Sequence, residues 1–202
     1  MSLKLFTYSI FFLIAFPTFG DDYLIEEMES LRSSLDQNDP DRSELSLRLA
    51  DLYFDVSIQE NADKNIIEKR KKALSLYLDV LNGRDGITAA KGKKADIIRF
   101  QIARVLNKLH RVDEAKKYYF KVFNSKLVEK KVKREAAFSL AEYYEEKVVF
   151  KKSDEYYVKA ISLCENVTSC NYAHYKRAWL HYKEVKIETA IKELKLSLYE
   201  AD

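Results

Sequence analysis

Residues 110–122 read "HRVDEAKKYYFKV". The stretch holds one small residue, Ala115, followed one helical turn later by an aromatic residue, Tyr119. Two helices packed side by side approach closely only where one presents no bulk, and a large side chain on the same face then fills the space beside it. We therefore interpret "HRVDEA" as a turn between two helices and "AKKYYFKV" as the start of the second helix of a hairpin.

The same pattern recurs along the chain. In the last three units the small residue of the first helix and that of the second helix are twelve positions apart, whereas in the first unit they are 23 apart. This difference predicts an insertion of about eleven residues around "QENADKNIIEK" in the first unit. The small residues are Ala50, Ala103, Ala141 and Ala178 in the first helices and Ala73, Ala115, Ser153 and Ala190 in the second helices.

Composition agrees with a helical repeat. The chain has 202 residues, of which 47% are hydrophobic and 33% charged, which is too apolar for a disordered protein. Only four glycines and two prolines are present, and strand-rich folds need more turn residues than that. The net charge of +3 is small for this length, so no nucleic-acid partner is expected.

The repeating pattern resembles the tetratricopeptide repeat (TPR) of bacterial envelope proteins. The turn glycine and the closing proline of that repeat are missing here, and Ser153 once replaces the small alanine. The resemblance covers about 43–202 and implies an all-α solenoid of about four helix-turn-helix repeats, at roughly 43–82, 93–125, 132–164 and 170–202. It is carried by the pairs Ile102-Ala103 and Leu140-Ala141, by Tyr53 and Tyr144, and by the second-helix residues Tyr77, Tyr119 and Leu194.

Residues 21–42 are expected to form a capping helix and a linker ahead of the first repeat. The segment "DDYLIEEMESLRSSLD" begins with two acidic residues, which favour a helix N-terminus. Its expected packing stripe is Leu24, Met28, Leu31 and Leu35. Further on, "GRDGITAAKGKK" at 83–94 holds three of the four glycines, and we expect a flexible link there that serves as a hinge.

Residues 1–20 have the pattern of a secretory signal peptide. An apolar run from Leu5 to Phe16 follows Lys4, and small residues then precede a possible cleavage point after Gly20. With the family resemblance, this predicts a periplasmic protein. An uncleaved inner-membrane anchor with a periplasmic domain is the alternative. Because exported proteins meet an oxidising environment, Cys164 and Cys170 are a possible disulfide, the alternative being two reduced thiols.

No catalytic or metal-binding constellation stands out. The three histidines are His110, His174 and His181, and the last two are seven residues apart rather than the four of metal-binding helix motifs. The carboxylates alternate with lysines, as on solvated helix faces. We therefore expect no enzyme activity, no cofactor and no metal.

A solenoid of helix pairs presents a concave surface to partner proteins. Among the side chains that an alignment of the first helices places on this surface, we select seven candidate partner-binding residues: Arg104, Lys108, Glu142, Glu145, Tyr175, Trp179 and Tyr182. The aromatic cluster is the sharpest candidate, although it could instead pack against a partner chain or within the core. A second apolar surface is expected on the last helix, at Ile191, Leu194, Leu198 and Tyr199, where a second copy could dock.

Two functions follow from these surfaces. The first is an exported scaffold or adaptor that binds a partner protein through its concave face. The alternative is a structural subunit that associates peripherally with an envelope complex through the apolar last helix. A third class, an enzyme or cell-wall-binding accessory, has no support in the sequence.

Overall fold

The structure is a computed structural model that describes residues 20–59, 65–165 and 170–198. In these ranges it contains nine helices and no strand, which confirms the predicted all-α solenoid. The predicted signal peptide lies outside the described residues except for Gly20, and part of the predicted insertion, 60–64, lies outside them as well. The helices are α1 Gly20–Ser34, α2 Asp41–Gln59, α3 Ile66–Asn82, α4 Gly92–Lys108, α5 Val112–Asn124, α6 Lys130–Glu146, α7 Phe150–Ser162, α8 Asn171–Lys183 and α9 Ile187–Ser197.

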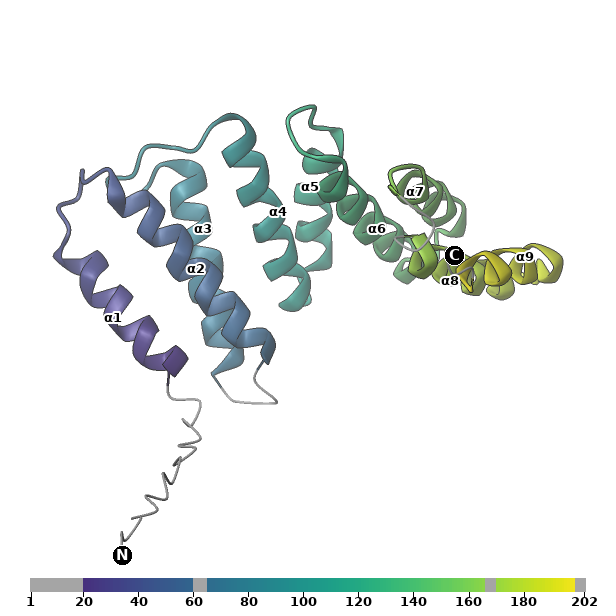
Figure 1. Cartoon of the computed structure of the whole chain (residues 1–202), viewed down its shortest axis with the longest axis horizontal. Coiled ribbons are helices and arrows are strands. Elements are labelled where there is room, and N and C mark those ends of the chain that lie inside the picture. The colour runs from purple at the N-terminus through teal and green to yellow at the C-terminus, as the bar shows by residue number, and fades with distance from the viewer. Residues whose placement is uncertain (1–19, 60–64, 166–169, 199–202) are drawn as a thin grey trace, which may run out of the picture.

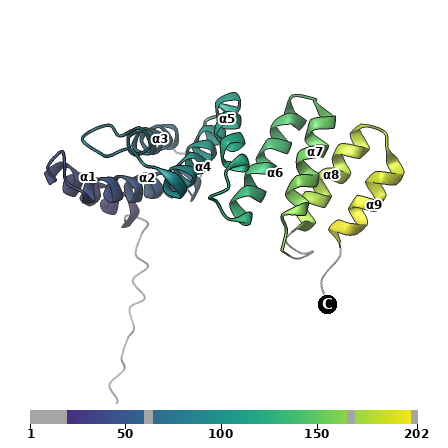
Figure 2. The ribbon, with the colours of Figure 1, turned by 90° about the horizontal axis from the view of Figure 1, so that it is seen from above.

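The helices follow one another in a curved row, with α1 and α9 at opposite ends (Figures 1 and 2). After α1, they pair as the hairpins α2–α3, α4–α5, α6–α7 and α8–α9, and each helix packs mainly on its neighbours in sequence. No helix in the described part of the chain is both long and apolar enough to cross a bilayer.

Small residues lie where the two helices of a hairpin meet. Ala50, Ala103 and Ala141 are fully buried in the first helices, and Ser153 is fully buried in α7. The Ser153 hydroxyl donates a hydrogen bond of 2.9 Å to the backbone carbonyl of Ala141. This bond explains why serine replaces alanine at this position, because a small side chain with a satisfied hydroxyl still allows close approach.

One hydrophobic core runs from Ile25 in α1 to Leu180 in α8. Aromatic rings join neighbouring helices through edge-to-face contacts, such as Phe100 with Tyr119 at 6.0 Å between ring centroids. Tyr119, the residue on which the hairpin interpretation rests, is buried. The predicted pairing of a small and a large residue therefore builds the core.

The turns inside the last three hairpins lack glycine but keep the backbone conformation that favours it. His110, Val148 and Val185 follow α4, α6 and α8 with φ angles of 59°, 58° and 61°. A left-handed conformation costs a residue with a side chain roughly 1–2 kcal/mol. Helix packing therefore imposes the turn, whichever residue occupies it.

Helix α1 packs in a different register from the one that its apolar pattern predicts. Ile25 is its buried residue and Met28 lies against the core, whereas Leu24 and Leu31 are exposed. Polar contacts fix this register, because Tyr53 of α2 donates a short hydrogen bond to Glu29 of α1. Two residues of the predicted stripe, Leu24 and Leu31, thus lie along an open edge of the array.

The glycine-rich loop after α3 is fastened to α1 and α2. Asp85 accepts hydrogen bonds from Arg32 at 2.5 Å and from Arg42 at 2.9 Å. Gly86 has a φ of +74°, and a Cβ there would lie 1.9 Å from the carbonyl oxygen of Gln37. The segment expected to act as a hinge is therefore held in place by ion pairs and a close backbone approach.

Candidate protein-binding groove

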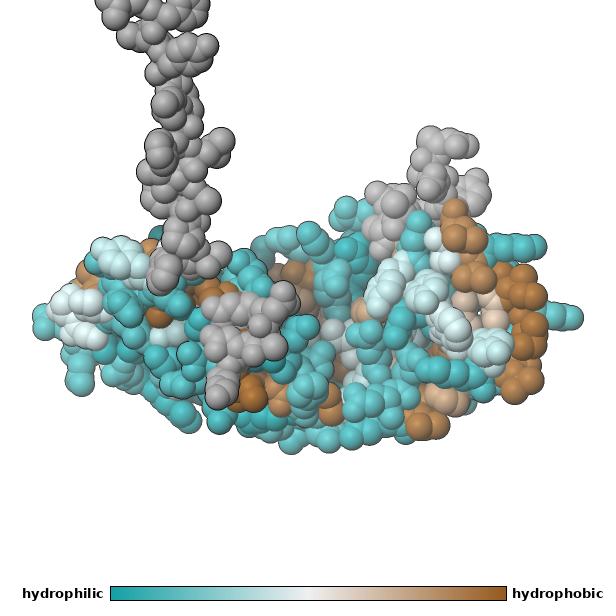
Figure 3. Space-filling view, turned by 90° about the horizontal axis from the view of Figure 1, so that it is seen from below, coloured by the Kyte–Doolittle hydropathy of each residue, from teal (hydrophilic) through white to brown (hydrophobic). Residues whose placement is uncertain are grey.

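An apolar groove lies between α8 and α9, at the end of the array that α1 does not occupy. It has a volume of about 330 Å³. Figure 3 shows pale aromatic side chains beside a brown column of aliphatic ones at this end of the molecule. We call it the terminal groove; it is lined by Tyr175, Ala178, Trp179, Tyr182, Ile187, Ala190, Ile191 and Leu194.

Helical spacing brings these side chains to one surface. Tyr175, Trp179 and Tyr182 are four and three residues apart on α8, and the aliphatic residues of α9 have the same spacing. The ring centroids of Tyr175 and Trp179 are 6.4 Å apart, and those of Trp179 and Tyr182 are 5.6 Å apart, both in edge-to-face contact. The rings therefore hold one another in place.

The aromatic row continues beyond the groove toward α6. Tyr175 stacks with Tyr172 at 6.2 Å, and Tyr172 contacts Phe138 of α6 at 5.2 Å between ring centroids. This connection places the groove residues in one series with a ring that packs against the core. The aromatic wall of the groove is therefore anchored to the preceding hairpin.

The large side chains of the groove are exposed and lie next to one another. Trp179 is 46% exposed, Ile191 50% and Leu194 43%. Contiguous exposed apolar surfaces are rare on folded domains and are often functional. Trp and Tyr are also the residues most often found as interface hot spots.

The preceding hairpin, α6–α7, has an equivalent surface, and helix α8 packs beside it. Four positions of α6 and α7 correspond to the groove lining, at the same distances from the small residues. They are Glu142, Glu145, Asp154 and Tyr157, where the last hairpin has Trp179, Tyr182, Ile191 and Leu194. The three carboxylates form ion pairs with basic side chains of α8. The terminal groove is thus a helix-docking face whose polar anchors have been replaced by apolar residues.

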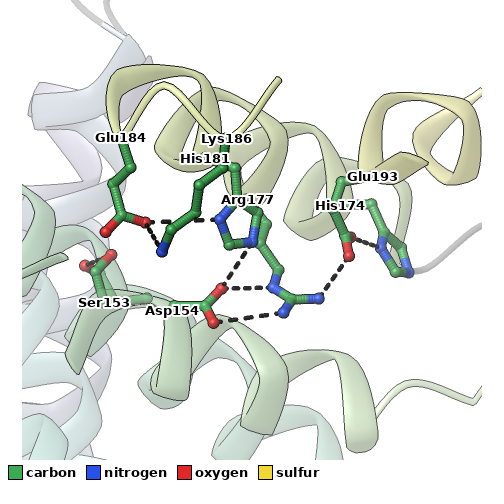
Figure 4. A network of polar contacts seen from close by, with 9 residues as sticks. Ser153, Asp154, His174, Arg177, His181, Glu184, Lys186 and Glu193 are labelled. Carbon is green, nitrogen blue, oxygen red and sulfur yellow. Dashed lines mark hydrogen bonds and ion pairs between the residues drawn. The ribbon is translucent and has the colours of Figure 1, made fainter. Parts of the chain in front are cut away.

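A network of polar contacts joins the last hairpin to α7 (Figure 4). Arg177 of α8 forms ion pairs of 2.6 Å with Asp154 of α7 and with Glu193 of α9. His174 lies 2.7 Å from the other oxygen of Glu193, and Nε2 of the buried His181 lies 3.3 Å from Asp154. Both α8 histidines therefore lie among carboxylates of the hairpin joint. Among the described residues, no three metal-ligating side chains cluster as a metal site would require.

Two of the predicted partner-binding residues, Glu142 and Glu145, pair with lysines of α8. Lys183 lies 2.6 Å from Glu145, and Lys176 lies 3.5–3.6 Å from both carboxylates. Burial raises the pKa of Glu142. Burial alone would also raise the pKa of Glu145, but the hydrogen bonds from Lys183 and Tyr157 outweigh it and lower that pKa. This acidic pair holds the last hairpin to α6.

The two predicted basic residues lie farther along the array, on α4. The Arg104 guanidinium lies over the ring of Phe54, 5.0 Å from its centroid, and donates to Gln101 at 2.8 Å. Lys108 has an exposed side chain, and its backbone carbonyl accepts a hydrogen bond from Arg70 at 2.9 Å. Of the seven predicted residues, the structure therefore gathers the three aromatic ones in the groove.

Sequence reasoning did not bring the two walls of the groove together. It assigned the aromatic residues of α8 to a concave surface and Ile191 and Leu194 to a separate outer face, and it omitted Ile187. Leu198 is exposed near the same end, and Tyr199 lies outside the described residues. The constant distance of twelve residues between the small residues was the available signal, because it fixes which parts of α8 and α9 lie side by side.

The loop that leads into the last hairpin is closed by a disulfide. It joins Cys164, just after α7, to Cys170, the residue before α8. The start of α8 is therefore tied covalently to the end of the preceding hairpin.

No protein-family model and no curated protein matches the sequence. Solved structures do. The crystal structure of MamA is 17% identical with a TM-score of 0.61, over 88% of this chain and 86% of that one. MamA 41-end from Desulfovibrio magneticus RS-1 is 14% identical with a TM-score of 0.64, over 88% and 84%. A Podosopora anserina putative kinesin light chain with nearly identical TPR-like repeats is 13% identical with a TM-score of 0.60, over 88% and 85%. The chain thus has the fold of TPR-type solenoids.

Proposed function

We propose that this protein is an exported, non-enzymatic scaffold that binds a partner protein in the terminal groove. The observation that carries the proposal is the groove itself, where three mutually supporting aromatic rings face three exposed aliphatic side chains. Its lining is almost wholly apolar and, apart from the hydroxyls of Tyr175 and Tyr182, holds no nucleophile or base and no group that would orient one. It is suited to the burial of an apolar protein surface.

The preorganised rings favour binding energetically. Fully burying one large apolar side chain contributes roughly 1.5–3 kcal/mol, and the groove offers six that are partly open to solvent. Because the rings already contact one another, little side-chain entropy is lost when a partner binds. The groove therefore supports binding by a few central residues, with the charged rim contributing specificity.

The proposed compartment is the periplasm. Two features support it: the signal-peptide pattern of residues 1–20 and the disulfide between Cys164 and Cys170, a bond that persists in oxidising compartments. An uncleaved segment that anchors a periplasmic domain to the inner membrane is the alternative. In either case the repeat array would face the envelope, where it could associate peripherally with a larger complex.

A structural subunit that assembles through its last hairpin is the second candidate function. The observation that favours it is the exposure of Ile191 and Leu194. Both candidates now use one surface, because these residues form the wall opposite Trp179. They differ in what fills the groove, a foreign ligand or a fixed neighbour in a complex.

Capture from an envelope extract tests the proposed function. The bait is residues 20–202, and the test variant is Trp179→Ala/Ile191→Ala, which opens both walls of the groove. The matched control is Phe120→Ala, which removes a similarly exposed ring from α5. We expect a partner that is retained by the wild-type and control baits and lost by the groove variant. Equal capture by all three baits would place the binding surface elsewhere.

A further inference from the structure

We propose that helix α1 of a second copy occupies the terminal groove, so that copies of this chain join head to tail. The inference deepens the proposed function by naming the partner, and it rests on that function in using the same groove. Three observations carry it: two exposed leucines on one face of α1, opposite charge at the two ends, and the placement of those ends.

The first observation is the apolar edge of α1. Leu24 and Leu31 are exposed, although they belong to the strongest apolar stripe of that helix. Leu31 and Leu35 line a shallow groove with Leu45 of α2, whose rim is Asp41, Glu44 and Arg48. Leu24 and Leu31 are seven residues apart, so they lie two turns from each other on one face of the helix. Since α1 packs on the array through Ile25 and Met28, these two leucines remain available to a second chain.

The second observation is charge complementarity. Residues 20–59 contain eleven acidic and three basic side chains, a net charge of −8. Residues 170–198 contain six basic and three acidic side chains, a net charge of +3. Because Lys176, Arg177 and Lys183 already pair with carboxylates of α6 and α7, the positive charge beside the groove comes from Lys192 and Lys195 of α9. Opposite charges at α1 and at these lysines steer the two ends together, whereas a groove-to-groove dimer would bring the lysines of two copies close to one another.

Individual side chains show the same complementarity close to the two surfaces. Asp21, Glu26 and Glu27 are exposed on α1. Lys192 and Lys195 are exposed on α9, next in sequence to the groove residues Ile191 and Leu194. An acidic helix with an apolar stripe therefore meets an apolar groove with a basic rim.

The third observation is that the two surfaces lie at opposite ends of the row of helices (Figures 1 and 2). A rigid array cannot bring its own α1 to its own groove. Contact between different patches of two copies is heterologous, so it leaves a free groove and a free α1 at every stage. Association then continues until the chain of copies closes into a ring or the supply of monomer runs low.

The experiment measures the molar mass of residues 20–202 by sedimentation at several concentrations and two salt concentrations. We expect masses beyond the dimer, rising with concentration and falling as salt screens the ends. Two variants each block one surface without a change of charge: Leu24→Asn/Leu31→Asn on α1, and Ile191→Asn/Leu194→Asn in the groove. Each should weaken self-association at least about a hundredfold, because two apolar contacts are lost.

Mixing the two blocked variants gives the decisive result. One retains a working groove and the other a working α1, so an equimolar mixture should form a dimer and nothing larger. The matched control is Ile97→Asn/Val158→Asn, which changes two similarly exposed residues in the middle repeats and should assemble like the wild type. Circular dichroism confirms that each variant retains the wild-type helix content.

Three outcomes would overturn the proposal. A wild-type chain that stays monomeric at all concentrations has no such contact. Assembly lost only in the groove variant, with the α1 variant unaffected, indicates a groove-to-groove dimer. Assembly that both blocked variants retain lies elsewhere on the surface. In the first case the capture experiment can still find a foreign partner in the groove, so the two proposals fail separately.

Discussion

At the scale of single residues, position in the repeat overrides local preference. Val148 and Val185 adopt a left-handed backbone that β-branched residues rarely accept, 37 residues apart. Both side chains are largely exposed and gain little from packing. The helices on either side of the turn therefore impose this conformation. Glycine, which would adopt it without steric strain, is absent from both positions.

Restoring glycine at such a turn should stabilise the protein. Val148→Gly and Val185→Gly each relieve roughly 1–2 kcal/mol of backbone strain, offset by roughly 0.5–1 kcal/mol of extra entropy in the unfolded chain. We expect a net gain of about 0.5–1 kcal/mol in the free energy of unfolding, measured in urea. The control is Val149→Gly, because that neighbour has a φ of −97° and should be destabilised. Similar losses at 148 and 149 would contradict the strain account.

The two half-buried carboxylates of α6, Glu142 and Glu145, should respond in opposite ways to amide substitution. Hydrogen bonds lower the pKa of Glu145, so its ionised form stabilises the fold above its unfolded-state pKa and this contribution disappears as the pH falls through the lowered value. The Glu145→Gln variant should therefore lose about 1–2 kcal/mol of its free energy of unfolding at neutral pH. In acid, the free energies of unfolding of the variant and the wild type should converge.

Glu142 is the matched comparison for this test. Burial raises its pKa, so the ionised form carries a cost at neutral pH. Glu142→Gln should leave the free energy of unfolding unchanged or raise it, as measured by urea titration at several pH values. A loss as large as that of Glu145→Gln would show that Lys176 depends on both carboxylates equally.

At the scale of elements, the sequence predicts hairpins better than it predicts how α1 attaches. The hairpins depend on local spacing, because a small residue and a large one a turn later can be recognised in a single segment. The register of α1 depends on contacts with residues 24 and 53 positions away, Glu29 with Tyr53 and Arg32 with Asp85. No periodicity within α1 reveals those partners, so the apolar stripe was assigned to the wrong face.

The difference between local and long-range contacts also explains which groove residues could be predicted from the sequence. The aromatic residues of α8 are conspicuous in composition and were predicted as a binding cluster. Their partners on α9 could be assigned only after the two helices were placed side by side. A buried joint such as Arg177 with Asp154 and Glu193 likewise needs three helices in their final positions.

The fastened loop after α3 gives a test at this scale. Gly86→Ala should be strongly destabilising, by roughly 3 kcal/mol or more, because the added Cβ would overlap the backbone of Gln37 and the residue has a positive φ. Gly92→Ala also has a positive φ but meets no atom within 4 Å, so we expect a loss of only about 1–2 kcal/mol. Thermal unfolding of the two variants measures the difference. Equal losses would mean that the close approach to Gln37 does not constrain the loop.

At the scale of the whole molecule, the described array is a row of hairpins whose joints are not alike. Earlier joints are filled by core side chains such as Ile98, Val122 and Ala137, whereas Leu180 is the residue that α8 and α9 contribute to the continuous core in the described part of the chain. The joint before the last hairpin has one ring contact, between Phe138 and Tyr172, and the disulfide at its edge, and its other side-chain contacts are mainly the ion pairs of Arg177, Lys176 and Lys183.

An array of repeats unfolds locally first at the interface where two neighbouring repeats stabilise each other least. Ion pairs at the partly exposed last joint are screened by salt far more than apolar contacts are. The final hairpin should therefore exchange its amide hydrogens as a separate cooperative unit, ahead of the rest, with a rate that salt increases. Uniform protection along all four hairpins, unchanged by salt, would show a single unit instead. If the last hairpin unfolds separately, ionic strength will set the fraction of molecules in which the terminal groove is folded. This effect adds to the effect of salt on binding affinity.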